Sequence, residues 1–204
     1  MTIRFHKGDL PNLDNYHDSI AVDSETLGLN PLRDRLCVVQ LSPGDGTADV
    51  VQIAKGQTDA PNLKKLLEDP ARTIIFHFAR FDVAVLLNAL GIECGTIYCT
   101  KIASRLTRTY TDRHGLKDLV KELINVDISK QQQSSDWAAE TLSQAQLEYA
   151  ASDVLYLHDL RAHLDQRLER EGRKELAKAC FEFLPTRAKL DLAGWPETDI
   201  FAHS

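Results

Sequence analysis

Short apolar runs separated by turn residues dominate the first half of the chain, and they predict strands. A short strand is expected over residues 3–6. Five further strands, expected to form the sheet, cover residues 20–25, 36–41, 47–53, 72–78 and a part of 92–98. Turn-forming residues at positions 43–46 join two of these strands directly, which predicts a three-stranded meander over residues 20–53.

Helical periodicity dominates the second half. The expected helices cover residues 62–68, 81–90, a stretch from residue 100, 116–124, 143–168 and 173–183. The order of the expected elements is strands first, then alternating helices and strands, and finally helices. This order predicts an α/β protein with a mixed sheet flanked by helices. We expect one domain over residues 1–204, with its core over about residues 1–170 and a helical C-terminal extension over 171–204.

Charge and composition restrict the possible functions. The formal net charge of −6 and the pI of about 5.6 argue against a protein that holds long nucleic acids on a broad basic surface, but they allow a short substrate. The sequence contains no apolar run of about 18 residues and no apolar signal region at its start, so we expect no membrane span and a cytoplasmic protein. The four cysteines form no C-x-x-C pair and are expected to be free thiols.

Two acidic residues end the apolar strand over residues 20–25. Asp23 and Glu25 are two positions apart, so a strand points both carboxylates to the same face. Two such charges about 4 Å apart repel each other by about 4 kcal/mol at an effective dielectric constant near 20. A divalent cation between them would turn this repulsion into attraction.

Two further acids are placed where they can join this pair. Asp82 follows the strand over residues 72–78, and Asp153 lies in the long helix, four positions after Tyr149 and on the same helix face. Ligands that are all oxygen suit Mg²⁺ or Mn²⁺. Two such ions about 4 Å apart can hold the attacking and leaving oxygens of a phosphodiester, and a phenol beside them can orient water.

In this order and at these spacings, D-x-E, H-x-A-x-F-D and Y-x-x-x-D resemble the motifs of the DEDD exonuclease superfamily, in its tyrosine-bearing subclass. The segments RLCVVQLS, GLKDLVKEL and SKQQQSSDWAAETLSQAQLEYAASDVLYL are similar to ribonuclease D. The short chain and its opening GDLPNLDNY resemble the nano-RNase C family, which trims very short RNAs, including dinucleotides such as pGpG, and forms ring-like homo-oligomers. One departure is Cys99, where many ribonuclease D relatives carry Asp.

The resemblance implies a ribonuclease H-like fold with a mixed five-stranded sheet and a defined set of site residues. Two divalent cations, Mg²⁺ or Mn²⁺, would be held by Asp23, Glu25, Asp82 and Asp153, and Tyr149 would complete the catalytic set. Substrate binding would fall to Thr26, Leu27, Leu29 and His77. Asp23 would bridge both metals, Tyr149 would orient the attacking water, and Leu29 would wedge between bases.

The activity implied is two-metal 3′→5′ hydrolysis of short single-stranded RNA with a free 3′ end, or of DNA, to nucleoside 5′-monophosphates. The resemblance also implies a homo-oligomer, an octameric ring. The alternatives are ribonuclease D-like trimming of longer structured RNA, a DNA 3′→5′ exonuclease, and an inactive exonuclease fold that serves as a nucleic-acid-binding scaffold.

Simpler structural roles compete for several of these residues. Asp23 and Glu25 could pair with Arg33 or Arg35. Asp82 could only favour a helix N-terminus, and Tyr149 and Leu29 could belong to the core. The basic residues Arg80, Lys101, Arg105, Arg108, Arg113 and Lys117 could face phosphates or only solvent, and Trp137 and Trp195 could stack on bases or pack in the core or a subunit interface.

Overall fold

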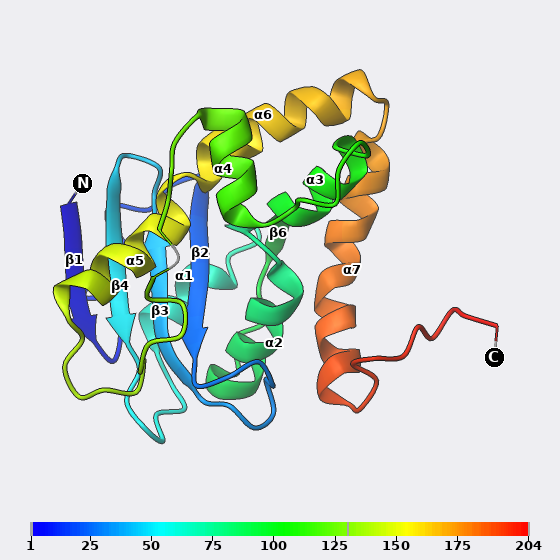
Figure 1. Ribbon diagram of the computed structural model, residues 1–204. Coiled ribbons are helices and arrows are strands. Elements are labelled where there is room, and N and C mark those ends of the chain that lie inside the picture. Colours follow the sequence, from blue (N-terminus) through cyan, green and yellow to red (C-terminus); the bar gives the residue numbers. More distant parts are fainter. Residues whose placement is uncertain (1, 130, 204) are drawn as a thin grey trace.

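The computed structural model describes residues 2–129 and 131–203, and within them the chain forms one mixed sheet with helices around it (Figure 1). The strands are β1 (Thr2–Lys7), β2 (Ser19–Thr26), β3 (Leu36–Ser42), β4 (Thr47–Gln52), β5 (Thr73–Phe76) and β6 (Thr96–Cys99). The helices are α1 (Pro61–Leu67), α2 (Ala79–Leu90), α3 (Thr100–Thr107), α4 (Leu116–Ile124), α5 (Gln144–Leu155), α6 (Leu157–Arg170) and α7 (Lys174–Leu192).

The strand order in the sheet is β1-β4-β3-β2-β5-β6. The expected meander is confirmed, because β2 pairs antiparallel with β3 and β3 pairs antiparallel with β4. The expected mixed α/β sheet is also confirmed, but the sheet has six strands and not five. The additional strand is β1, which pairs in parallel with β4 at an outer edge, and its Arg4 lies opposite Asp49.

Two hydrophobic clusters cover the two faces of the sheet. The smaller cluster packs Val38 and Val50 against Trp137 and Ala150 of the α5 region. The larger cluster packs Val39, Val51 and other strand residues against α1 and α2, and it extends into α6 and α7. Glu25 lies opposite Val38 in the β2–β3 ladder, so its side chain belongs to the face that α5 covers.

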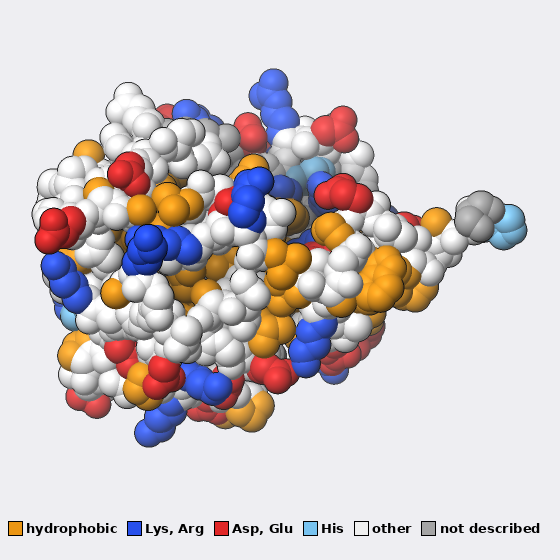
Figure 2. Space-filling model, turned by 90° about the horizontal axis from the view of Figure 1, so that it is seen from below, with side chains coloured by type: hydrophobic (Ala, Val, Ile, Leu, Met, Phe, Trp, Pro, Cys, Tyr) orange, Lys and Arg blue, Asp and Glu red, His pale blue; other side chains and the backbone are white. Residues whose placement is uncertain are grey.

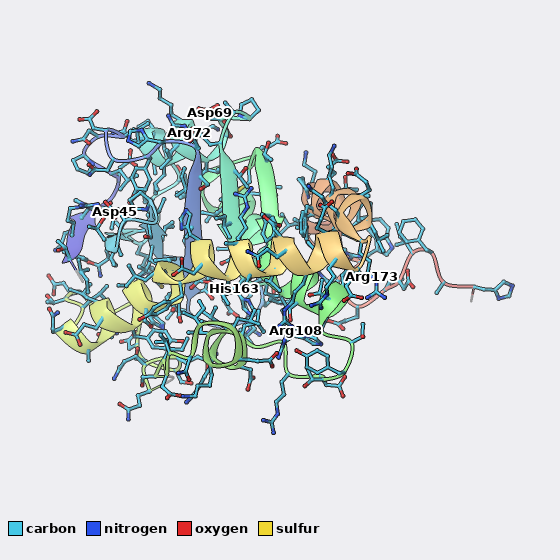
Figure 3. All side chains as sticks on the ribbon, turned by 90° about the horizontal axis from the view of Figure 1, so that it is seen from above. Asp45, Asp69, Arg72, Arg108, His163 and Arg173 are labelled. Atoms are coloured by element: carbon cyan, nitrogen blue, oxygen red, sulfur yellow. The ribbon has the colours of Figure 1, made fainter. Side chains whose placement is uncertain are left out.

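The prediction of one long helix over residues 143–168 is wrong. It forms α5 and α6, which follow one another across the sheet (Figure 3), with Tyr156 between them at φ −102° and ψ −1°. The helix expected to end near residue 183 instead continues to Leu192, with Pro185 inside it. Buried Phe181, Leu184 and Ala188 lie on one face of α7 and hold this segment against the core.

The molecular surface agrees with the acidic composition. On the face seen in Figure 2, Lys and Arg side chains alternate with Asp and Glu side chains and form no continuous basic area. Among the residues described, no helix has the length and apolarity that crossing a membrane would require.

Candidate active site

Three of the expected acids come together at the end of β2. Asp23 and Glu25 project from β2, and Asp153 projects from α5, which crosses the same face of the sheet. One oxygen of each carboxylate lies within 4.8 Å of the others. The alternation of the strand and the crossing of the helix therefore bring together residues 130 positions apart in the sequence, from 23 to 153.

Gln40 holds the first of these acids from the neighbouring strand. It lies opposite Asp23 in the β2–β3 ladder and is fully buried. Its amide Nε2 donates a hydrogen bond to Asp23 Oδ2 at 2.6 Å. Because an amide can donate to a carboxylate without adding a charge, Gln40 fixes the orientation of Asp23 and leaves the negative charge of the site intact.

Asp82 stands slightly apart from the other three acids. It lies in the first turn of α2, where its charge favours the positive helix end, and it is 2 % exposed. Ser24 Oγ donates to Asp82 Oδ1 at 2.7 Å, which ties α2 to β2. Asp82 is close enough to influence Asp23 electrostatically, but its carboxylate lies outside the group of Asp23, Glu25 and Asp153.

Burial and mutual repulsion make these carboxylates costly in the absence of a cation. Burial first, and then the charges of Asp82 and Asp153, raise the pKa of Asp23 well above its ordinary value. Burial and the charge of Asp153 raise the pKa of Glu25 to about 9, and burial raises that of Asp82 to about 7. A cluster of hard oxygen donors with this excess of negative charge fits a divalent cation such as Mg²⁺ or Mn²⁺.

Tyr149 lies beside the acids on the same face of α5. Burial, followed by the charge of Asp153, raises the pKa of its phenol, so Tyr149 is neutral at physiological pH. Its ring packs against Trp137 with 5.9 Å between the ring centroids, and Trp137 is only 2 % exposed. Trp137 therefore packs in the core, which is one of the roles expected for it. Its ring supports the ring of Tyr149.

A cavity of about 290 Å³ opens over the acids, and we call it the acid cavity. Asp23, Glu25, Tyr149 and Asp153 line it, together with Ser24, His77, Phe78, Lys101 and Lys117. His77 Nδ1 lies 2.9 Å from Thr100 Oγ1, so the imidazole is held by α3 at the cavity wall. Lys117 and Lys101 bring positive charge to a cavity whose floor is negative, as a substrate phosphate would require.

Of the three other residues expected to bind substrate, Thr26 ends β2, and Leu27 and Leu29 lie in the loop that follows it. Leu27 and Leu29 are 53 % and 88 % exposed, so the interpretation of Leu29 as a core residue is wrong. Thr26 Oγ1 donates to the carbonyl of Gly28. A Cβ at Gly28 would lie 2.2 Å from Asp34 Oδ2, so a larger residue here would have to displace the Asp34 carboxylate, which accepts a hydrogen bond from the backbone N–H of Asn30.

The alternative in which Asp23 and Glu25 pair with Arg33 or Arg35 is wrong. Arg33 pairs with Asp34 at 2.7 Å, and Arg35 donates to the carbonyl of Ile53, so neither neutralises the acids of β2. Arg108, expected on the surface, is 1 % exposed and pairs with Glu122.

The sequence interpretation missed Gln40, Ser24 and Phe78. The first had a visible signal, because Gln40 is the single polar residue in the otherwise apolar run from residue 36 to 41. Ser24 lies between the two acids of β2, where strand alternation points it to the opposite face. The backbone of Phe78, which has a positive φ, left no signal in the residue type.

Comparisons with known proteins agree with this geometry. A family model described as 3′-5′ exonuclease matches residues 8–169. Ribonuclease D of Gluconacetobacter diazotrophicus is 36% identical over 154 residues, and ribonuclease D of Escherichia coli is 31% identical over 154 residues. These matches cover 76% of this chain but only 39% and 40% of the two relatives, so the chain spans about two fifths of their length.

Solved structures extend the similarity to the whole chain. Brucella melitensis NrnC with bound Mg²⁺ is 70% identical with a TM-score of 0.97, and the structure of that protein bound to pGG is 71% identical with a TM-score of 0.98. Both matches cover 100% of this chain and 100% of the other. The ribonuclease H-like fold expected from the motifs is thereby confirmed.

Proposed function

Because the chain belongs to the 3′-5′ exonuclease family, we propose that it is a 3′→5′ exoribonuclease that hydrolyses short oligoribonucleotides, dinucleotides among them, to nucleoside 5′-monophosphates. The observation that carries this proposal is the convergence of three half-buried carboxylates beside a neutral tyrosine in one cavity. The likeness to a protein whose structure holds pGG supports a short substrate.

Asp23, Glu25 and Asp153 would hold the divalent cations, with Asp82 as a more distant fourth ligand. When bound, the cations supply positive charge to the attacking and leaving oxygens of the phosphodiester. Gln40 keeps Asp23 oriented, and Ser24 does the same for Asp82. These residues set the positions of the charges before substrate enters.

Tyr149 would orient the attacking water as a hydrogen-bonding group. Its raised pKa keeps the proton on the phenol oxygen, so it positions the water without removing its proton. Lys101 and Lys117, at the walls of the cavity, would attract the phosphates of the substrate.

The proposal is tested by following product release from oligoribonucleotides of two to about twenty nucleotides with Mn²⁺ or Mg²⁺. We expect nucleoside 5′-monophosphates and the highest kcat/KM on the shortest substrates. Asp23→Asn should lower kcat by at least about 100-fold, as loss of one electrostatic group in an active site does. The exposed Asp59→Asn is the matched control and should keep wild-type turnover.

Three results would contradict this proposal. Preference for the twenty-nucleotide substrate would favour the ribonuclease D-like trimming of longer RNA. Full turnover by Asp23→Asn would remove the metal site from the reaction, and absence of any metal-dependent product would favour the inactive scaffold.

We further propose that residues 1–204 act as one exonuclease domain in a homo-oligomeric ring, an octamer. The likeness to NrnC over the whole chain supports the single domain. Exposed Trp195 and Phe201 at the C-terminal end support a subunit contact there. Light scattering tests the assembly, and a mass near the 22.9 kDa of one chain would refute it.

A further inference from the structure

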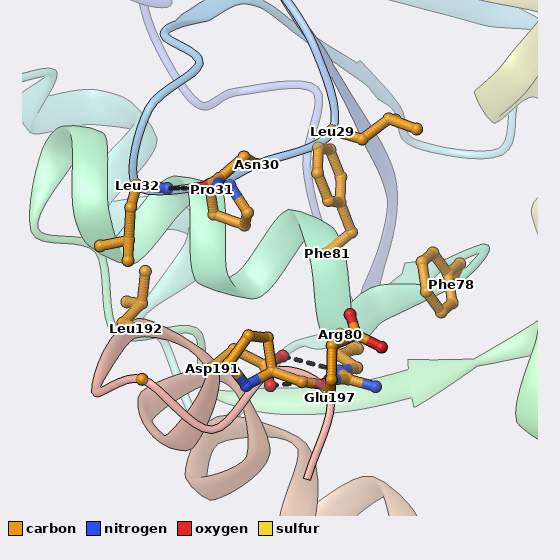
Figure 4. A pocket seen from close by; sticks show the side chains of 12 residues that line it. Leu29, Asn30, Pro31, Leu32, Phe78, Arg80, Phe81, Asp191, Leu192 and Glu197 are labelled. Atoms are coloured by element: carbon orange, nitrogen blue, oxygen red, sulfur yellow. Dashed lines mark hydrogen bonds and ion pairs between the residues drawn. The ribbon is translucent and has the colours of Figure 1, made fainter.

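A buried arginine lies at the end of α3, beside α6 (Figure 3). Arg108 is 1 % exposed, and among the described residues it is the only Lys or Arg that is buried. By contrast, the side chain of Arg80, whose pair with Asp191 joins α2 to α7 (Figure 4), is 36 % exposed. A charged side chain is almost never fully buried unless it is paired and hydrogen-bonded. The partners of Arg108 therefore show which parts of the chain it holds together.

The guanidinium of Arg108 joins three segments. Its Nη1 donates to Ser104 Oγ of α3 at 3.0 Å and to the carbonyl oxygen of Arg113, in the connection between α3 and α4, at 2.6 Å. Its Nε donates to one carboxylate oxygen of Glu122 in α4 at 3.2 Å, and its Nη2 donates to the other. The hydrogen bonds from Arg108 lower the pKa of Glu122 to about 2, so this carboxylate stays charged. The planar fork of one guanidinium thus fixes α3, the connection and α4 relative to one another.

Residues of α6 and of the start of α7 hold this junction from outside. The hydroxyl of Tyr110 donates to Glu122 and accepts a hydrogen bond from Arg167 Nη1 of α6 at 3.0 Å. Arg173, which directly precedes α7, donates to the carbonyl oxygen of Leu106 in α3 at 2.5 Å. The junction is therefore fastened to the helices behind it and can serve as a fixed point.

Both helices that Arg108 joins begin at the acid cavity. Lys101 is the second residue of α3 and Lys117 is the second residue of α4, and both line the cavity. Among the described residues that line it, no other is a Lys or Arg. Arg108 directly follows α3 and Glu122 lies in the last turn of α4, so the ion pair ties the two helices at the ends that point away from the cavity.

Packing alone gives α4 little support. Only Leu119 and Val120 of this helix are buried. Lys101 is held locally, because its Nζ lies 4.4 Å from the ring centroid of Phe78 in a cation–π contact. Lys117 is exposed, so the place of its ammonium group depends on the place of α4.

We infer that Arg108 is a positioning residue that, through Glu122 and α4, holds Lys117 at the acid cavity for contact with a phosphate of the substrate. The inference rests on the proposed function, because the phosphate belongs to the oligonucleotide that is hydrolysed. Arg108 acts from a distance, since it is not among the described residues that line the cavity. Loss of Arg108 therefore weakens substrate binding and leaves the chemical step at the acids of β2 and α5 unchanged.

A double-mutant cycle on hydrolysis of a diribonucleotide tests this inference. Arg108→Met removes the guanidinium and leaves Glu122 solvated, because that side chain is 37 % exposed. We expect Arg108→Met and Lys117→Ala each to raise KM about tenfold, as loss of one hydrogen bond to a charged group does, with kcat within about twofold of wild type. Because both substitutions act on the same contact, the double variant should also raise KM about tenfold, and not about a hundredfold.

Salt dependence and a matched control separate positioning from a general loss of stability. The KM of wild type should rise with KCl concentration, and it should rise less steeply in Arg108→Met and in Lys117→Ala. A loss of stability alone lowers the folded fraction and leaves KM and its salt dependence unchanged. Arg4→Met is the control, because it breaks an Arg–carboxylate pair, 2.7 Å long, at the outer edge of the sheet. It should keep the wild-type KM.

A milder variant keeps the test decisive if Arg108→Met does not fold. Arg108→Lys retains the positive charge but cannot bond to three segments at once. It should raise KM in the same direction, and the increase should vanish in the Lys117→Ala background.

The inference is overturned if the Arg108 variants keep the wild-type KM, if their effect multiplies with that of Lys117→Ala, or if Arg4→Met raises KM equally. Dissociation constants of the same dinucleotide, measured with Ca²⁺ in place of Mn²⁺, give the same cycle without hydrolysis. Absence of turnover by wild type would refute the proposed function, whereas the binding cycle would still decide the role of Arg108.

Discussion

Replacement of Glu25 by glutamine should stabilise the metal-free protein. The pKa of Glu25 is raised from 4.5 to about 9 by burial and by Asp153. Between these two pH values the folded state holds a proton that the unfolded state has lost, so the stability of wild type falls as pH rises through this window. Glutamine is neutral at every pH and removes this cost.

The size of the effect follows from the linkage between proton binding and folding. One proton contributes about 1.4 kcal/mol per pH unit, so two pH units, from 5.5 to 7.5, give an upper limit of about 2.7 kcal/mol. Asp23 and Asp82 also have raised pKa values and share the proton, which lowers our expectation to about 1.5 kcal/mol. For a chain of this length, that corresponds to about 3–6 °C in Tm.

The assay is thermal or urea unfolding of wild type and Glu25→Gln in EDTA at pH 5.5 and 7.5. The advantage of the variant should grow with pH, and Mn²⁺ should stabilise wild type more than the variant. Glu140→Gln, at an exposed position, is the control and should show no such trend. A variant less stable than wild type in EDTA, or an advantage independent of pH, would refute the electrostatic reasoning.

Three further substitutions test separate parts of the structure. Tyr149→Phe should lower kcat by about 10- to 100-fold with little change in KM, measured by steady-state hydrolysis; an unchanged kcat would contradict its role. Ser24→Ala removes the hydrogen bond to Asp82 and should weaken Mn²⁺ binding in calorimetry by about tenfold, and an unaltered affinity would contradict this. Asp49→Asn breaks the ion pair between buried Asp49 and half-buried Arg4 and should cost about 2 kcal/mol of unfolding free energy in urea while Mn²⁺ affinity stays constant; equal urea midpoints would contradict it.

Asp49 also illustrates how polar burial can be favourable. Burial alone would raise its pKa, but hydrogen bonds from Arg4, Tyr16 and His6 outweigh burial and lower it. Three partners surround one carboxylate, whereas in the acid cavity several carboxylates surround one another. The contrast explains why only the second cluster calls for a cation.

The sequence predicted the elements that carry the acids because their signals are local. The apolar run before Asp23 and the i, i+4 spacing of Tyr149 and Asp153 each fix a side chain within one element. The meander was also predictable, because the turn residues at positions 43–46 join the strands on either side of them by a short connection, which makes these strands antiparallel neighbours.

The remainder depends on contacts between distant parts of the chain. The sheet gains β1 only because Arg4 and its neighbours reach a strand more than forty positions away, and no local pattern specifies that partner. Pro185 ordinarily ends a helix, but packing of Phe181 and Leu184 against the core keeps α7 continuous around it. The positive φ of Phe78 arises at the junction between β5 and α2, and the residue type gives no sign of it.

The contact between Trp137 and Tyr149 makes the protein its own optical reporter. The chain has two tryptophans, and only Trp137 is buried beside the cavity, whereas Trp195 lies on the C-terminal tail. In a Trp195→Phe variant, intrinsic fluorescence would come from Trp137 alone. Ion or nucleotide entry next to Tyr149 could then be followed in real time, without a dye or a labelled oligonucleotide.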